Sequence, residues 1–241
     1  MSEPGAMVAL ETATETVGVA VRTASGVQAD LTLTGRRRHV ETLTPALEHL
    51  LTQLGLVPAD IGVVAVDVGP GLFTGLRVGL ASAKGLAQSL GIGIIGATSL
   101  DILTEGAAAA GLRGLVLACV DARRGEVFAA VHEVTGSGAP VERLATGLFA
   151  PEDLAAALPA LAGAPVHAVG DGALRYADVL KTVAGVAPGA PGLAFPPPAA
   201  LLTLARARMD AGEPPVAPAT VVPLYMREAD AKSNFARAVR A

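Results

Sequence analysis

Two acidic turns and one glycine-rich loop contain the residues whose types and spacing could do chemistry. The first turn, ETATET, places Glu11 before the hydroxyls of Thr12 and Thr14, and the second, DARRGEV, begins at Asp121. The loop, DVGPGLFTGLRVG, has glycines at 69, 71, 75 and 79. Acids that hold a metal ion, beside backbone N–H groups that approach phosphate closely, are the components of a nucleotide site. These segments therefore raise the question of phosphate chemistry.

The same segments lack groups that a working nucleotide site needs. In the second turn two arginines stand where glycines would let a phosphate approach, and the loop has no Lys followed by Ser or Thr to reach phosphates and Mg²⁺. We therefore expect that the chain binds no cofactor by itself, and that its arginines contact a nucleotide only at an interface with a partner. The residues assigned as vestigial phosphate contacts are Glu11, Thr12, Thr14, Asp121, Arg123 and Arg124.

The spacing of the side chains predicts neither a metal site nor a catalytic nucleophile. The four histidines, at 39, 49, 132 and 167, include no pair four residues apart that would share one helix face. The single cysteine, Cys119, lies in the apolar run GLVLACVD and is interpreted as a small buried hydrophobic residue. No G-x-S-x-G elbow is present. We expect no catalytic residue and no metal site.

The glycine loop is interpreted as structural. One proline fixes a backbone angle, two flanking glycines allow the reversal from strand to helix, and a threonine is expected to cap the helix. Glycines inside that helix cost about 1 kcal/mol each relative to alanine but give a smooth surface on which another helix can lie. That helix is either the first helix of this chain or a helix of a partner, and the sequence leaves both open. The loop residues are Gly69, Pro70, Gly71, Thr74 and Gly75.

The elements that position these segments repeat along the chain. Three extended segments are followed by a helix in HVETLTPALEHLLTQLG, the strand GVVAVD, the loop and its helix, the strand IGIIGAT and a short helix, in the order βββαβαβα. A similar order begins again after Gly114, although residues 183–198 are predicted to form a surface excursion. Duplicated α/β lobes of this order resemble the actin, Hsp70 and hexokinase superfamily, which has a ribonuclease H-like fold.

We place an N-terminal, partner-binding lobe at residues 1–105. The second lobe, residues 106–241, is expected to be smaller or degenerate, and its final segment could pack back on the first lobe.

Composition excludes several classes of protein. The chain has 241 residues, a net charge of −4 and 51% hydrophobic residues, and its longest uncharged run, residues 182–205, contains five prolines. Prolines disfavour a membrane-spanning helix, and the N-terminus has no basic segment and apolar core typical of a secretion signal. We expect a cytoplasmic protein without membrane contact. Basic clusters occur only locally, at Arg36–Arg38 and at Lys232, Arg237 and Arg240.

Five blocks of the sequence resemble the TsaB family, also called YeaZ, within the peptidase M22-like group. The blocks are VALETATETVGVAV, RRRHVETLTPALEHLL, VDVGPGLFTGLRVGLASAKGLAQSLGIGIIGATSLDIL, VDARRGEVFAAVH and PLYMREADAK. The resemblance is strong over residues 7–134, and the last block supports it. It implies a non-catalytic scaffold subunit of the bacterial machinery that makes threonylcarbamoyladenosine (t6A) in tRNA.

The resemblance also implies partners. TsaC makes threonylcarbamoyl-AMP, TsaD transfers the group, and a TsaB-like subunit binds and activates TsaD, recruits the TsaE ATPase and meets tRNA only through the complex. When alone it forms a homodimer through the first-lobe helices that receive TsaD. On those helices the residues assigned to the partner surface are His39, Thr42, Ala46, Leu76, Arg77, Gly79, Leu80 and Lys84. We expect Gly79→Glu to abolish pairing and leave the monomer folded.

Two alternatives stay open at this point. One is an actin-like ATPase or M22-type metallopeptidase acting alone, in which Glu11 and Asp121 hold a divalent ion. The other is direct tRNA binding by Arg36–Arg38 and the basic tail, which would make the association strongly dependent on salt.

Overall fold

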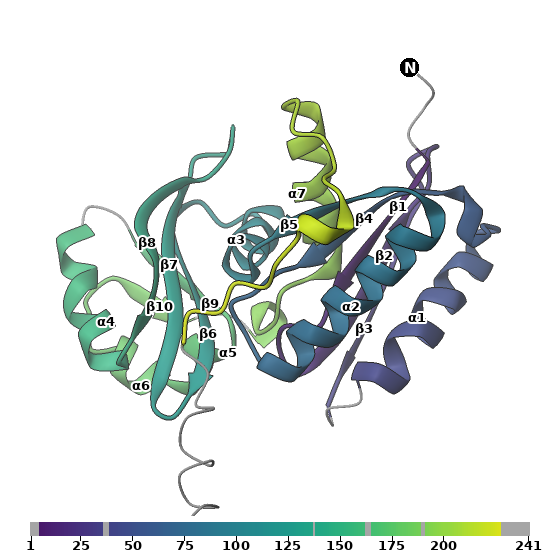
Figure 1. Cartoon of the computed structure of the whole chain (residues 1–241). Helices are drawn as coiled ribbons and strands as arrows, with labels where there is room; N and C mark the ends of the chain where they lie inside the picture. The colour runs from purple at the N-terminus through teal and green to yellow at the C-terminus, as the bar shows by residue number, and fades with distance from the viewer. Residues whose placement is uncertain (1–4, 36–38, 137, 162–164, 189–190, 228–241) are drawn as a thin grey trace, which may run out of the picture.

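Two five-stranded sheets, each covered by helices on both faces, form two lobes (Figure 1). The computed structural model describes residues 5–35, 39–136, 138–161, 165–188 and 191–227. The strand orders are β3-β2-β1-β4-β5 and β8-β7-β6-β9-β10, so the two lobes have the same topology. In each lobe the first three strands form an antiparallel meander and the other two join in parallel. The predicted duplicated α/β fold is confirmed.

The first lobe follows the predicted element order. Its strand β4 is buried without alternation because helices cover both faces of the sheet. Its elements are β1 (Ala6–Glu11), β2 (Thr16–Arg22), β3 (Gln28–Thr34), α1 (His39–Gln53), η1 (Pro58–Asp60), β4 (Ile61–Asp67), α2 (Phe73–Leu90), β5 (Gly93–Ala97) and α3 (Ser99–Ala109).

The second lobe repeats this order with shorter helices. The expectation of an irregular excursion over residues 183–198 is wrong in part, because β10 pairs in parallel with β9 and completes the sheet. Its elements are β6 (Gly114–Arg123), β7 (Glu126–Val134), β8 (Val141–Phe149), α4 (Pro151–Ala157), η2 (Leu158–Leu161), β9 (Val166–Val169), α5 (Asp171–Arg175), α6 (Ala177–Leu180), β10 (Val186–Pro188), η3 (Pro191–Leu193), α7 (Pro198–Asp210) and η4 (Pro218–Thr220).

The two lobes exchange a helix. Helices α1 and α2 cover one face of the first sheet, and the opposite face is covered by α7, which follows the second lobe in sequence. Helix α3, which ends the first lobe in sequence, packs on the second sheet through Leu100, Leu103 and Ala107. The other face of the second sheet carries α4, η2, α5 and α6. Because α3 and α7 also contact each other, they form the layer that joins the lobes.

None of the helices in the described residues combines the length and the apolar character that crossing a membrane requires. The clusters Arg36–Arg38 and Lys232, Arg237 and Arg240 lie outside the described residues.

Candidate functional site

The polar side chains of the first acidic turn, between β1 and β2, point into the protein. The Glu11 carboxylate is fully buried and accepts hydrogen bonds from the backbone N–H two residues later, at 2.8 Å, and from the Thr16 hydroxyl, at 2.9 Å. The Thr12 hydroxyl donates to the Gly75 carbonyl oxygen at 2.8 Å, and the Thr14 and Thr16 hydroxyls are 2.9 Å apart. Glu11, Thr12 and Thr14 are therefore buried and hydrogen-bonded within the chain, and their assignment as phosphate contacts stays a prediction.

The glycines of α2 lie directly on this turn. A Cβ atom at Gly75 would be 2.0 Å from the Thr12 carbonyl oxygen, and one at Gly79 would be 2.3 Å from the Thr12 hydroxyl oxygen. At Gly71, before the helix, a Cβ would be 2.2 Å from the Ala13 carbonyl oxygen. Side chains at these positions would separate the helix from the turn. The smooth face of α2 thus covers the chain's own acidic turn, and at Gly75 it also lies beside His39 of α1, the helix of this chain that the sequence had offered as a neighbour.

This packing corrects part of the predicted partner surface. Gly79 is buried against the turn, so a glutamate there would disrupt the monomer itself, contrary to the expectation for Gly79→Glu. Arg77 is exposed, Thr42 and Lys84 are partly exposed, and only these three of the predicted surface residues offer substantial area. The predicted partner residues that are buried in this chain are His39, Ala46, Leu76, Gly79 and Leu80.

The loop before α2 makes the expected reversal, but its cap differs from the prediction. Gly69 has a φ of 98°, in the region that glycine adopts easily, and the peptide bond to Pro70 is cis. The helix begins at Phe73, and no side chain caps it. Thr74 therefore lies in the first turn of α2 and is not its cap.

A second buried acid, which the sequence analysis missed, lies beside Glu11. Asp67 ends β4, which is parallel to β1, so the carboxyl ends of the two strands bring both acids together. Asp67 Oδ1 accepts hydrogen bonds from Gly69 N at 2.7 Å and Ser99 Oγ at 2.8 Å, whereas its buried Oδ2 has no partner among the described residues. Burial raises the pKa of Asp67 to about 7, and burial together with the neighbouring Asp67 raises the pKa of Glu11. The sequence shows an acid at the end of each of these two segments, but only the structure shows that the two strands pair in parallel.

The second acidic turn, between β6 and β7, has a different electrostatic environment. Arg123 and Arg124 have φ angles of 64° and 58°, in the left-handed region that glycine usually occupies. The Arg123 guanidinium donates to Asp121 Oδ2 at 2.9 Å, and Arg175 Nε lies 3.7 Å from the same oxygen. This acid is thus partnered by two arginines of its own lobe. Arg124 is exposed.

Asp171, which the sequence analysis also missed, corresponds to Asp67 in the second lobe. It follows β9, which is parallel to β6, and its Oδ1 accepts a hydrogen bond from Asp121 N at 3.0 Å. The pKa of Asp171 is raised, mainly because the carboxyl group is buried, and the positive charge of Arg123 lowers it in part. Each lobe therefore has an acid at or close to the carboxyl end of each of its two central parallel strands.

An ion pair joins the two turns across the space between the lobes. Arg123 NH2 lies 2.5 Å from Glu15 Oε1, and Glu15 belongs to the turn after β1. A glutamate and an arginine of the chain itself thus connect the two turns.

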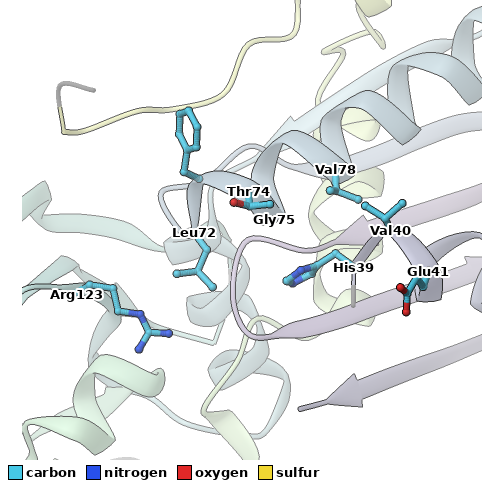
Figure 2. A pocket seen from close by; sticks show the side chains of 9 residues that line it. His39, Val40, Glu41, Leu72, Thr74, Gly75, Val78 and Arg123 are labelled. Atoms are coloured by element: carbon cyan, nitrogen blue, oxygen red, sulfur yellow. The ribbon is translucent and has the colours of Figure 1, made fainter. Parts of the chain in front are cut away.

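A cavity of about 470 Å³ lies beside this junction, between the starts of α1 and α2 (Figure 2). Arg123 approaches it from the second lobe, and His39 anchors its floor by donating from Nε2 to the Thr14 carbonyl oxygen at 3.0 Å. At its rim Val40 is 72% exposed and Phe73 is 47% exposed. The cavity is lined by His39, Val40, Glu41, Leu72, Phe73, Thr74, Gly75, Val78 and Arg123.

No group of three His, Cys, Asp or Glu side chains within the described ranges is arranged to hold a metal ion. The geometry thus combines buried acids, turns joined to each other and an open cavity with an apolar rim.

Several known proteins are similar to this chain in sequence. The family model described as TsaD, tRNA N6-adenosine threonylcarbamoyltransferase, matches residues 31–233. The tRNA threonylcarbamoyladenosine biosynthesis protein TsaB of Escherichia coli is 36% identical over 132 residues, which are 55% of this chain and 57% of that protein. An uncharacterized protein of Mycobacterium tuberculosis is 35% identical over 228 residues, which are 94% of this chain and 93% of that protein.

A solved structure matches nearly the whole fold. YeaZ from Pseudomonas aeruginosa superposes with a TM-score of 0.79 at 26% identity, and the match covers 92% of this chain and 99% of that chain. The sequence matches to the TsaB proteins of E. coli and Bacillus subtilis span little more than half of each, 57% and 55%. From the family model and the matching relatives, the chain belongs to the TsaB (YeaZ) family.

Proposed function

We propose that this chain is a non-catalytic accessory subunit of t6A biosynthesis that binds and activates a TsaD-like transferase and recruits a TsaE-like ATPase. The observation that carries the proposal is the packing of α2 on the first acidic turn. Because the Gly75 and Gly79 face touches Thr12 directly, this face of α2 is occupied by the chain's own first turn. The similar proteins of E. coli and B. subtilis are named as t6A biosynthesis proteins, and we propose the same process for this chain.

The cavity between α1 and α2 is the proposed docking site for the transferase. Val40 and Phe73 offer apolar surface at its rim, and Arg77, with its guanidinium 3.7 Å from the Phe73 ring centroid, offers a charge beside them. An apolar centre with a few charged groups around it is the usual anatomy of a protein interface. A homodimer of the isolated chain would use the same face, so the two assemblies would compete.

The proposal includes no cofactor for the isolated chain. Arg123 lines the docking cavity, so a nucleotide held by a partner could meet its guanidinium only in the assembled complex. Contact with tRNA is likewise proposed to be indirect, and the site of action to be the cytoplasm.

Reconstitution tests the function directly. Cognate TsaC, TsaD and TsaE are incubated with unmodified tRNA, threonine, bicarbonate and ATP, with and without this chain, and t6A is measured by mass spectrometry of the nucleosides. We expect modified nucleoside only when the chain is present. Equal t6A yields in both reactions would contradict the proposal.

A pair of variants tests the docking site. Val40→Asp places a charge at the rim of the cavity, and we expect the affinity for TsaD, measured by titration calorimetry, to fall at least about tenfold. Val27→Asp is the matched control, because Val27 is 56% exposed in the β2–β3 turn, outside the cavity lining, and should leave the affinity unchanged. Equal affinities of the two variants would rule out this placement.

The enzyme alternative is tested on the isolated chain. Calorimetry with ATP and Mg²⁺, together with elemental analysis for bound metal, should show neither saturable nucleotide binding nor a stoichiometric metal. Tight ATP binding accompanied by hydrolysis in the absence of partners would instead support an actin-like ATPase.

A further inference from the structure

The chain after α7 crosses from the first lobe to the second as an extended segment (Figure 1, yellow). We call residues 216–227 the C-terminal strap. Its first end is fixed to the edge of the first sheet, where Val216 and Ile94 exchange two backbone hydrogen bonds of 2.9 Å. Farther along, Leu224 N donates to the Val68 carbonyl oxygen at 2.7 Å, next to the glycine loop. The strap is therefore attached to the first lobe at two points.

The middle of the strap lies on the first turns of α2. The Tyr225 ring is 5.3 Å from the Phe73 ring, centroid to centroid, and its hydroxyl accepts a hydrogen bond from Arg77 Nε at 3.1 Å. Both aromatic side chains are partly exposed, at 44% and 47%. The strap thus contacts the helix whose first turn lines the docking cavity.

The far end of the strap is bound to the second lobe. Arg227 donates to the Ala122 carbonyl oxygen at 3.2 Å and forms an ion pair with Glu126, both in the β6–β7 hairpin. The same hairpin carries Arg123, which is held from the other side by Glu15 of the first lobe. The hairpin therefore forms ion pairs at two places. One is with Glu15 of the first lobe, and the other is with Arg227 of the strap, which is attached to the first lobe.

These two links are polar and partly exposed, and Met226 of the strap adds an apolar contact with the core of the second lobe. The Arg227 and Glu126 side chains are 28% and 37% exposed, and those of Arg123 and Glu15 are 34% and 44% exposed. Ion pairs with this exposure contribute little individually and are weakened by salt. The apolar layer of α3 and α7, by contrast, holds the lobes together on the buried side. The links can therefore open while the apolar layer stays intact as a hinge.

We propose that the C-terminal strap and the Glu15–Arg123 pair form a releasable clasp that sets how far the two lobes close. Because Arg123 lines the cavity beside α1 and α2, opening the clasp moves one wall of that cavity away from the other. The clasp is a property of the isolated chain and does not depend on the proposed function.

The separation of the lobes in solution tests the clasp. Spin labels on Gln53→Cys in the first lobe and Glu152→Cys in the second report their separation by pulsed electron paramagnetic resonance, since both positions are exposed. The natural Cys119 is fully buried, and burial raises the pKa of its thiol, so it stays unlabelled. The distance distribution is compared for the labelled parent, Arg227→Gln, Glu15→Gln and the double variant.

The matched control is Arg143→Gln, which removes an exposed ion pair with Glu133 that lies wholly within the second lobe. We expect one narrow distribution for the parent and the control, and a broader distribution with a longer mean in each clasp variant, largest in the double variant. A distribution of the parent's width and mean in the double variant would overturn the proposal.

A second variant separates opening from unfolding. Glu126→Gln removes the Arg227 ion pair from the opposite side but leaves the hydrogen bond to the Ala122 carbonyl oxygen, so it should shift the distribution in the same direction as Arg227→Gln and no further. Each variant is melted by circular dichroism. A longer distance in a variant that keeps the parent's cooperative melting transition supports the clasp, whereas a broad distribution that comes with loss of that transition shows unfolding and overturns it.

Discussion

At the scale of single residues, the buried acids of the first lobe define its electrostatics. Glu11 and Asp67 are buried side by side, and in the described part of the chain neither forms an ion pair. Burial disfavours a charged carboxylate, and a like charge nearby adds to this effect, so the two cannot both ionise easily. In the second lobe Asp121 instead has Arg123 and Arg175 as partners. The equivalent turns therefore differ in whether their acid has an arginine as a partner.

The raised pKa of Asp67 predicts a pH dependence of stability. The pKa is about 7 in the folded chain and 3.8 in its ordinary state, so between these values the folded state binds more protons. The free energy of unfolding should therefore be highest below about pH 4 as far as this group contributes, and fall by on the order of a few kcal/mol as the pH rises to about 7.

Asp67→Asn should remove most of this decline, because the amide keeps an acceptor for Gly69 N and Ser99 Oγ and cannot ionise. Urea denaturation of the parent and the variant at about pH 5 and about pH 8 measures the difference. The idea fails if both proteins lose the same stability between the two pH values.

At the scale of elements, α2 is the part whose sequence was hardest to interpret. Its glycines lower helix propensity, and their spacing indicates a close neighbour without saying which one. The structure shows that the glycines of this one helix have two different environments. Gly75 and Gly79 face the backbone and side chain of Thr12, whereas a Cβ at Gly85 would meet nothing within 4 Å.

Two alanine variants in α2 should therefore change stability in opposite directions. Gly85→Ala gains helix propensity in open space and should raise the free energy of unfolding by about 1 kcal/mol. Gly75→Ala forces a methyl group to within 2.0 Å of a carbonyl oxygen and should lower it by about 2 kcal/mol or more. Urea denaturation gives both values, and a stabilised Gly75→Ala protein would show that α2 does not need to touch the turn.

At the scale of the whole molecule, the exchange of helices makes the lobes depend on each other. Met7, Ala9 and Ala65 of the first sheet are buried against Leu201 and Leu202 of α7, which follows the second lobe in sequence. The sequence boundary near residue 105 therefore does not mark a part with a complete core.

A fragment of residues 1–112 should accordingly fail to fold by itself. It keeps every strand of the first sheet but lacks α7, so one apolar face of that sheet would be exposed to water. We expect dispersed amide resonances from the full chain and collapsed resonances with strong binding of a hydrophobic dye from the fragment. A well-dispersed spectrum of the fragment would show that the first lobe is independent.

The sequence by itself determined the duplicated order of elements, the starts and ends of most helices and strands, and the family, because periodicity, turn residues and motif blocks are local features. It also pointed to Glu11, Asp121 and Arg123 as residues of the two turns.

Only the tertiary structure decided what these residues touch. The burial of Thr12 under α2, the proximity of Asp67 to Glu11 and the link from Glu15 to Arg123 join residues that are 56 to 108 positions apart in the sequence. Such contacts depend on which strands become neighbours and on how the lobes close. These are properties of the packed chain, and no local pattern encodes them.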